Sequence, residues 1–217
     1  MPVKAAPLYG AQQSRFARYL ERREQRRPDL LSREHRRRLL AGLRGRVLEL
    51  GCGDGRAFEL YPAAVEHVLA VEPDPTARGV AAERARAAPV PVDVVDGSAD
   101  SLPAADESID AAVAIWVLCS VPDAAAALRE LRRVLRVGGE LRFYEHVRSA
   151  NPAFRAVQHA VDALFWKRAL GGCTTTRDTE AAIRAAGFRI ASLERGFHSS
   201  SPLTITSAPY VIGVAVR

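Results

Sequence analysis

The sequence has few cysteines, and their spacing limits the kinds of site that it can form. Its three cysteines, Cys52, Cys119 and Cys173, lie far apart in a chain of 217 residues, and no CxxC or His-x-Cys pair occurs. Zinc sites and disulfide frameworks are normally marked by closely spaced or paired cysteines. We therefore expect no metal site and no disulfide, as in a protein of the reducing cytoplasm.

Long apolar runs are also missing. The longest one, residues 111–121, is too short to span a bilayer, and the N-terminus carries charge without an apolar segment. We expect neither a membrane span nor a signal peptide. Apolar residues make up 48% of the chain and charged residues 26%, which is typical of a soluble globular protein. A cytoplasmic location is the expectation.

A net positive charge is missing outside the N-terminal segment. Residues 1–46 hold 13 of the 31 Lys and Arg and 4 of the 25 Asp and Glu, so the remainder has 18 against 21. The basic segment is either a patch for an anionic partner, such as RNA or a lipid surface, or a solvated arginine-rich helix face. No aromatic residue alternates with the arginines after Tyr19, which argues against single-stranded nucleic acid. We expect no nucleic-acid partner, and membrane-surface contact is the less favoured alternative.

Hydrophobic periodicity and turn residues predict an alternation of helices and strands. The predicted helices are residues 12–27, 32–43, 54–61, 75–87, 122–136, 152–168 and 179–186. The predicted strands are residues 46–50, 67–71, 90–95, 109–115, 140–147, 188–193 and 210–216. This order predicts an α/β fold with a mainly parallel sheet covered on both faces, and an antiparallel final pair. Residues 1–45 are expected to form a basic helical cap on one domain, residues 46–217. Ligands of such sheets bind at the carboxyl ends of the strands.

The loop after the first strand is rich in glycine. Gly51, Gly53 and Gly55 let the backbone approach a ligand closely. A dinucleotide loop would have glycine where Arg56 stands, and the Gly-Lys-Ser/Thr of a P-loop is absent. The loop therefore suits a nucleoside ligand with a small carboxylate and no pyrophosphate. Glu49 and Asp54 provide an acidic pair that suits a cationic amine.

Two further strand ends carry groups suited to a nucleoside. Glu72 ends the second strand, where a carboxylate can accept hydrogen bonds from both ribose hydroxyls. The third strand is followed by Ser98, Ala99 and Asp100, whose backbone and carboxylate suit an adenine edge. Each feature alone is weak evidence for a nucleoside site, but their order and spacing together are strong evidence for one.

The segments "VLELGCGDG", "VEPD", "DGSADSLP", "IDAAVAIWVLCSVPD" and "LRELRRVLRVGGEL" resemble the class I S-adenosylmethionine-dependent methyltransferases over about residues 45–150. The resemblance implies a Rossmann-like sheet of seven strands with a reversed last strand, the cofactor S-adenosylmethionine and the product S-adenosylhomocysteine. It assigns parts of the cofactor to residues near the predicted strand ends. They are Glu49, Gly51, Cys52, Gly53 and Asp54 for the methionine end, Glu72 and Pro73 for the ribose, Ser98, Ala99 and Asp100 for the adenine, and Ile115 and Trp116 for the sulfonium side. Many family members have Asp where this chain has Ser98, so adenine recognition here depends more on Ala99 and Asp100.

Further segments are similar to one branch of that superfamily. They are "WVLCSV", "EHV", "LGGCTTTRDT", "AGF" and "APYVIGVAVR". The branch includes alkyl thiol S-methyltransferases of animals, so the resemblance implies a small-molecule acceptor, with a thiol as the most specific candidate. Phosphatidylethanolamine N-methylation and the O- or N-methylation of a secondary metabolite remain alternatives. The sequence does not predict an oligomeric state.

The acceptor end has one candidate base. His146 ends the fifth predicted strand, where it is either a general base or a side chain that caps the strand by hydrogen bonding. Cys119 is expected to pack as a small hydrophobic residue. Residues 170–179 are expected to form a helix cap, through Thr176, and a wall of the acceptor pocket rather than a catalytic thiol. The expected pocket residues are Tyr9, Tyr19, Cys173, Thr174 and Thr175, with Phe165 and Trp166 on the opposite wall.

Overall fold

The structure is a computed structural model that describes residues 30–169, 172–199 and 202–217. Its helical elements are α2 (Leu30–Leu40), η1 (Phe58–Leu60), α3 (Pro75–Ala85), α4 (Ala124–Val134), α5 (Pro152–Val161), η2 (Asp162–Trp166), α6 (Lys167–Ala169), α7 (Thr179–Ala185) and η3 (Pro202–Ser207). Its strands are β1 (Gly45–Leu50), β2 (Val65–Val71), β3 (Val92–Val95), β4 (Ile109–Ile115), β5 (Leu135–His146), β6 (Arg189–Phe197) and β7 (Pro209–Val216).

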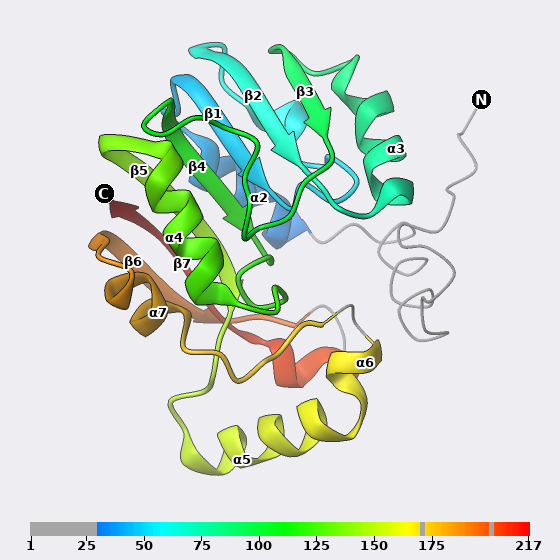
Figure 1. Cartoon of the computed structure of the whole chain (residues 1–217). Helices are drawn as coiled ribbons and strands as arrows, with labels where there is room; N and C mark the ends of the chain where they lie inside the picture. Colours follow the sequence, from blue (N-terminus) through cyan, green and yellow to red (C-terminus); the bar gives the residue numbers. More distant parts are fainter. Residues whose placement is uncertain (1–29, 170–171, 200–201) are drawn as a thin grey trace, which may run out of the picture.

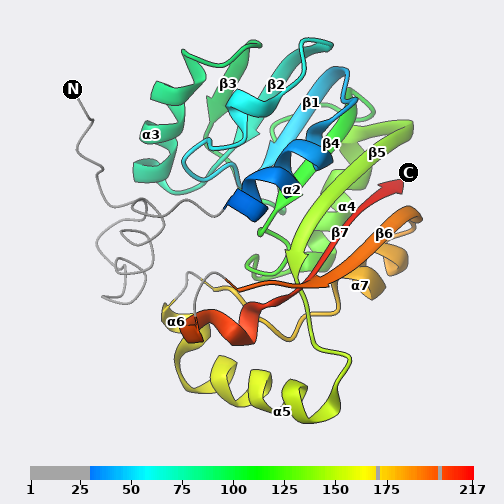
Figure 2. The same cartoon turned by 180° about the vertical axis from the view of Figure 1, so that it is seen from behind.

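The seven strands form one sheet in the order β3-β2-β1-β4-β5-β7-β6. The first five strands are parallel, whereas β7 pairs antiparallel with both β5 and β6. Helices α4 and α7 lie over one face and α2 over the other, which Figures 1 and 2 show from opposite sides. This confirms the predicted α/β architecture and its antiparallel final strands.

Each face of the sheet has its own buried cluster because the parallel strands are covered on both sides. One cluster joins Leu48, Ala112 and Phe143 to Leu128 of α4 and Ile183 of α7. The other cluster joins Val47, Val68 and Val113 to Leu40 of α2 and Ala81 of α3. Helix α2, which belongs to the predicted cap, therefore contributes directly to the core.

Acidic and amide side chains fix where several helices begin. Asp74 accepts hydrogen bonds from the amides of Thr76 and Ala77 at the start of α3, and Asn151 does the same for α5. A proline occupies the first helical turn in both cases. Asp178 caps α7 by accepting from Ala181 N, so the prediction that Thr176 is the cap was wrong. Thr176 instead donates its hydroxyl hydrogen bond to Asp162.

Two predicted elements differ clearly from the structure. Residues 54–61 do not form a helix: they contain only the short 3-10 turn η1, because the glycines take left-handed conformations up to Gly55. Strand β5 begins at Leu135 rather than at residue 140, and it continues through the two glycines that were expected to separate helix from strand. The predicted helix 12–27 lies outside the described residues.

The predicted helix 152–168 is three consecutive helical pieces. A π-helical turn, η2, joins α5 to α6. The apolar stripe read from its sequence does not face the core, since Val157, Leu164 and Phe165 are 50%, 75% and 45% exposed. Gln158 and Trp166 are the buried side chains instead. The segment lies beyond the carboxyl ends of β4 and β5 (Figure 1), where it covers loops instead of the sheet.

None of the helices in the described ranges is both long enough and apolar enough to cross a membrane.

Candidate functional site

The glycine loop after β1 leaves room for a ligand at one position. Gly51, Gly53 and Gly55 all have φ between 56° and 77°, which other residues rarely adopt. A Cβ atom on Gly51 would lie 2.7 Å from Val117 Cγ2, and one on Gly55 would lie 2.6 Å from the Phe58 ring. A Cβ on Gly53 would meet no atom within 4 Å. Gly53 is therefore the place where the loop faces open space.

Glu72 connects the ends of β1 and β2. Its carboxylate is 5% exposed and accepts hydrogen bonds from Gly53 N at 2.9 Å and from Asp74 N at 3.0 Å. Burial raises its pKa. The carboxylate thus fixes the glycine loop while lying at the strand end where a ribose was expected. Pro73, beside it, is exposed.

Glu49 is a buried carboxylate at the end of β1. Burial raises its pKa to about 7, although the Tyr61 hydroxyl donates to it at 2.8 Å. Arg36 lowers its pKa and Asp54 raises it through their charges. A buried carboxylate of raised pKa is a strong partner for an ammonium group, because the added cation favours the ionised form. The sequence did not indicate Tyr61, since no motif includes it.

Asp54 is already engaged by two arginines. It is 8% exposed, and its carboxylate forms ion pairs with Arg56 at 2.8 Å and Arg84 at 2.6 Å. Of the two predicted acidic residues, Glu49 is therefore the one whose carboxylate forms no ion pair with an arginine of the described ranges. Cys52 packs inward beside them, and burial raises the pKa of its thiol.

The predicted adenine segment follows β3 at the same edge of the sheet. Ser98 and Asp100 are exposed, and the Ser98 hydroxyl donates to the Asp100 carboxylate. Ala99 packs against the core cluster between them. Ser98 also pairs with Ser101 in an isolated bridge, which shapes this segment as a tight turn.

The chain leaves β4 through an unusual turn at Trp116. This residue has φ of 58°, which is strained for a bulky side chain, and its N–H donates to Tyr144 O at 2.8 Å. The next amides, those of Val117, Leu118 and Cys119, all donate to the buried carboxylate of Glu145, at 2.9 to 3.0 Å. Burial raises the pKa of Glu145 to about 7. Glu145, which no sequence motif indicated, thus holds the loop that follows β4.

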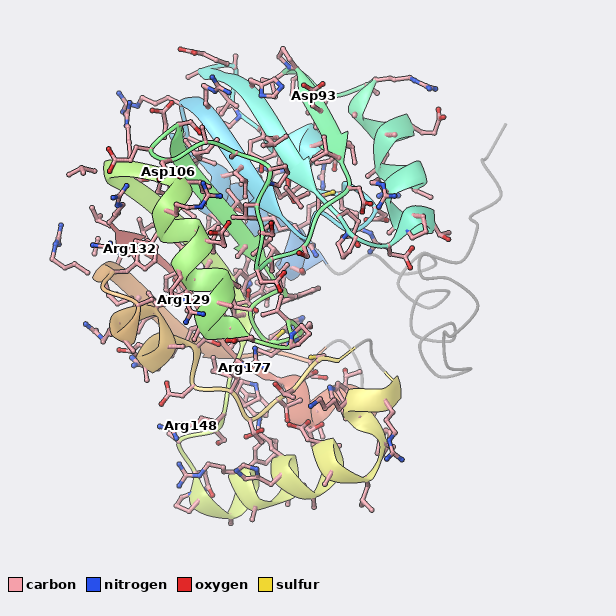
Figure 3. All side chains as sticks on the ribbon, in the orientation of Figure 1. Asp93, Asp106, Arg129, Arg132, Arg148 and Arg177 are labelled. Carbon is pink, nitrogen blue, oxygen red and sulfur yellow. The ribbon has the colours of Figure 1, made fainter. Side chains whose placement is uncertain are left out.

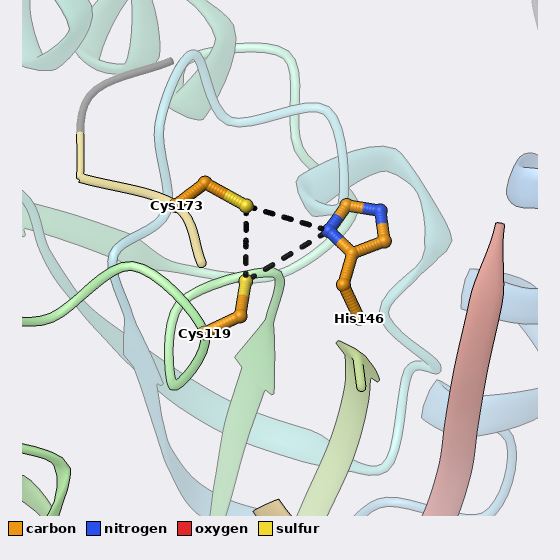
Figure 4. A group of neighbouring side chains, drawn as sticks. All are labelled: Cys119, His146 and Cys173. Carbon is orange, nitrogen blue, oxygen red and sulfur yellow. Dashed lines mark hydrogen bonds between the residues drawn. The ribbon is translucent and has the colours of Figure 1, made fainter. Parts of the chain in front are cut away.

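Three side chains from distant segments meet at the ends of β4 and β5. The sulfurs of Cys119 and Cys173 lie 3.8 Å apart, and each lies 3.8 Å from His146 Nδ1 (Figure 4). Both cysteines are buried and His146 is partly exposed. The His146 ring stacks on Trp116 at 5.2 Å between centroids, with 12° between the planes. The hydrogen bonds that Cys173 shares with Cys119 and His146 hold the pKa of the Cys173 thiol well below its usual range.

The loop before α7 is bonded directly to the loop after β4. Thr174 donates from both its N and its Oγ1 to Cys119 O, each at 2.9 Å. Arg177, which lies below α4 in Figure 3, donates to the carbonyl oxygens of Leu118 and Val121. Thr175 is fully buried and bonded to Asp162 of η2. Thr175 therefore supports the loop rather than lining an accessible pocket, contrary to the prediction.

The fold brings most of the predicted site residues to one edge of the sheet. Glu49, Gly53 and Glu72 lie around the glycine loop, and Trp116 and His146 lie at the neighbouring strand ends. Trp166, expected on the opposite wall, is 2% exposed and packs against Cys119 and Cys173, whereas Phe165 is largely exposed. The remaining pocket candidates, Tyr9 and Tyr19, lie outside the described residues.

The spacing of the cysteines predicted no metal site, and that prediction stays untested, but the fold brings together three side chains that could hold an ion. Cys119, His146 and Cys173 each offer one ligand atom, and these atoms all lie within 4.8 Å of one another. The sequence signal was indirect: Cys119 closely follows β4 and His146 is the last residue of β5. Adjacent parallel strands end at the same edge of a sheet.

Comparison with known proteins places these features in a family. Residues 48–143 match the family described as a methyltransferase domain. The human thiol S-methyltransferase TMT1B is 34% identical over 82% of this chain and 74% of its own length. The human thiol S-methyltransferase TMT1A is 32% identical over 79% of this chain and 70% of its own length.

Solved structures show the same fold. A S-adenosylmethionine-dependent methyltransferase of Thermotoga maritima superimposes with a TM-score of 0.65 at 25% identity. The match covers 94% of this chain and 97% of that protein, so it includes the antiparallel end of the sheet as well as the glycine loop.

Proposed function

We propose that this chain, which belongs to the class I S-adenosylmethionine-dependent methyltransferases, methylates the sulfur of a small-molecule thiol. The choice of a thiol as the acceptor is supported by the human thiol S-methyltransferases TMT1A and TMT1B. This chain matches more than two thirds of the length of each. That match reaches beyond the cofactor-binding segments, because it covers 82% of this chain, whereas the methyltransferase-domain match ends at residue 143.

The residues around the glycine loop fit S-adenosylmethionine. A Cβ on Gly53 would enter open space, which marks where the backbone is bare toward a ligand. In this proposal Glu49 would hold the amino group of the methionine end, and Glu72 the ribose hydroxyls. Ala99 and Asp100 would hold the adenine. When bound, the cofactor supplies a methyl group attached to a positively charged sulfur. A thiolate readily attacks the carbon of that methyl group.

The observation that carries the thiol proposal is the surroundings of His146. Its ring lies at the carboxyl end of β5, stacked on Trp116, the residue expected on the sulfonium side. The groups around it are sulfur atoms and indole rings, which suit a soft, weakly hydrated acceptor.

His146 is the described side chain best placed to take a proton from the acceptor. With a thiol as acceptor, His146 would take its proton, and S-adenosylmethionine held around the glycine loop would supply the methyl group to the thiolate. The products would be a methyl thioether and S-adenosylhomocysteine. The chain itself would contribute mainly by holding the acceptor and the cofactor close together in the right orientation.

A substrate panel tests the proposal. The protein is incubated with methyl-labelled S-adenosylmethionine and an alkyl thiol, a phenol, an amine or phosphatidylethanolamine vesicles, and the labelled products are counted. We expect transfer to the thiol at least tenfold above the other acceptors. His146→Ala is expected to lower the rate roughly 10²–10⁴-fold, whereas His159→Ala, an exposed change on α5, leaves it unchanged.

Transfer to the phenol, the amine or the phospholipid with none to the thiol would overturn the choice of sulfur. Those outcomes correspond to O- or N-methylation of a metabolite and to phospholipid N-methylation. Absence of cofactor binding in calorimetry would overturn the methyl-transfer proposal itself.

A further inference from the structure

We propose that Cys119, His146 and Cys173 bind one thiophilic divalent cation of the zinc type, with a fourth coordination position open for a thiolate. The cation site is inferred from the three side chains alone. Only the identity of the fourth ligand depends on the proposed function.

The ligand atoms already have the separations that a tetrahedral zinc ion requires. With Zn–S bonds of about 2.3 Å and Zn–N bonds of about 2.0 Å, two sulfurs lie roughly 3.8 Å apart and a sulfur and a nitrogen roughly 3.6 Å apart. The Cys119–Cys173 separation is 3.8 Å, and both sulfur–Nδ1 separations are 3.8 Å. Figure 4 shows the three atoms pointing toward one another, so an ion above their plane would complete the site with little movement.

The chemistry of the ligands selects a soft cation. Two thiolates and an imidazole favour zinc and its congeners over magnesium or calcium, which prefer oxygen. The two thiolate charges also balance a divalent ion, which lowers the cost of burying it. The surroundings are apolar, because Trp166, Trp116 and Val161 pack against the two cysteines. The nearby carboxylate of Glu145 is occupied by three backbone amides.

The site is held rigidly from two sides. Glu145 fixes the amide of Cys119 itself, at 3.0 Å. Both Thr174 hydrogen bonds end on the carbonyl oxygen of Cys119, so the two cysteine backbones are tied together. Gly172 permits this approach, since a Cβ there would lie 2.8 Å from Ser120 O. A site whose ligands are fixed in advance loses little conformational entropy when the ion binds.

Three protein ligands leave one position of a tetrahedral ion free, as in catalytic rather than structural zinc sites. A thiol that coordinates there is deprotonated, because the metal stabilises the thiolate. The metal–sulfur bond forms and the proton passes to solvent. With the ion bound, His146 is a ligand, so this route would replace the proton transfer to His146 described above for the metal-free protein.

Cobalt substitution tests the cation site directly. The reduced, chelator-treated full chain is titrated with Co²⁺, and its absorption is recorded before Zn²⁺ is added as a competitor. We expect one equivalent of Co²⁺, ligand-field bands of tetrahedral geometry, a thiolate-to-cobalt charge-transfer band, and full displacement by one equivalent of Zn²⁺.

Single substitutions identify the ligands. Cys119→Ser and Cys173→Ser should each weaken Zn²⁺ binding by more than the roughly 10–100-fold that loss of an outer-shell partner causes. Cys52→Ser is the matched control, because Cys52 is also a buried cysteine but its thiol donates to Gly53 O in the glycine loop. Circular dichroism of each variant reports whether it is folded. Equal metal binding in all three variants would overturn the assignment.

Two other outcomes contradict the proposal. Failure of the folded, reduced wild-type chain to bind Co²⁺ or Zn²⁺ overturns the cation site. Binding of arsenite without binding of Zn²⁺ would show that the site holds a trivalent ion with three ligands instead of a tetrahedral divalent ion. Neither outcome affects thiol methylation, which the labelled-substrate panel measures separately.

Adding an alkyl thiol to the cobalt-loaded protein tests the fourth position. We expect the charge-transfer absorption to increase, because a third sulfur then binds the metal. An unchanged spectrum would show that the fourth position is not open. If methyl transfer proves to use another acceptor, the metal titration still stands on its own result.

Discussion

The glycines of the loop after β1 share a left-handed backbone but differ in what a side chain would meet. Gly51 and Gly55 are required by their neighbours, Val117 and Phe58. At Gly53 no neighbouring atom excludes a side chain, and only the φ of 56° favours glycine. Gly53 is therefore the glycine of this loop at which an added methyl group would meet no atom of the protein.

We expect Gly53→Ala to lower the affinity for S-adenosylmethionine at least tenfold, because the new methyl group would enter the ligand's space. Gly42→Ala is the matched control: Gly42 has φ of 76°, meets no atom within 4 Å and lies in the exposed turn after α2. Both changes should cost about 1–2 kcal/mol of stability through the left-handed conformation. Calorimetry and urea denaturation measure the two effects. Equal cofactor affinity in both variants would show that Gly53 does not face the ligand.

At the scale of the elements, one side chain joins α5 to the rest of the site. Gln158 is fully buried, and its Nε2 donates to the carbonyl oxygens of Val147, Thr175 and Thr206 at 2.9 to 3.2 Å. Its Oε1 accepts from Ser149 N at 2.7 Å. These bonds connect the end of β5, the loop before α7 and η3. The apolar residues of α5 contribute less, since Val157 is half exposed.

Gln158→Ala should therefore loosen this region while leaving the sheet intact. We expect faster amide hydrogen exchange over residues 152–161 and 173–178, from a local loss of about 2–3 kcal/mol, with β1 and β4 unchanged. His159→Ala, the exposed neighbour on the same helix, is the control. Exchange that rises equally over all strands would mean that α5 unfolds only together with the whole domain.

At the scale of the molecule, cofactor binding and folding are linked through Glu49. Its pKa is about 7 in the folded chain against an ordinary 4.5, so the neutral form is favoured by folding. The ligand-free protein therefore loses stability as the pH rises from about 4.5 through 7. An ammonium group beside Glu49 reverses this effect, because it favours the carboxylate over the neutral form. Affinity for the cofactor should fall as the pH drops below 7.

The rise in melting temperature caused by S-adenosylmethionine should consequently be larger at pH 8 than at pH 6. At a concentration 100 times the dissociation constant, ligand binding adds about 2.7 kcal/mol of stability, or roughly 5–10 °C for a chain of this size. Scanning fluorimetry at fixed cofactor concentration gives the shift at each pH. In Glu49→Gln the difference between the two pH values should be lost, and a shift independent of pH in the wild type would contradict the assignment of Glu49.

Much of the architecture was predictable because it depends on local patterns. Buried parallel strands such as β4 read as continuous apolar runs, and the helices between them begin at residues such as Asp123. The errors arose where tertiary contacts override periodicity. The apolar stripe of α5 faces outward because the buried bonds of Gln158 orient the helix, and η1 is short because the glycine loop extends further than its spacing indicated.

The sequence by itself determined the sheet, the glycine loop and the carboxylates at the strand ends, since these follow from strand order and from residues a few positions apart. Only the tertiary structure decided which groups surround His146. Cys119 and Cys173 are 54 positions apart, and no local spacing relates them. They meet because parallel strands end at one edge, and because Thr174, Glu145 and Asp162 bind the loops that follow those strands into a single position.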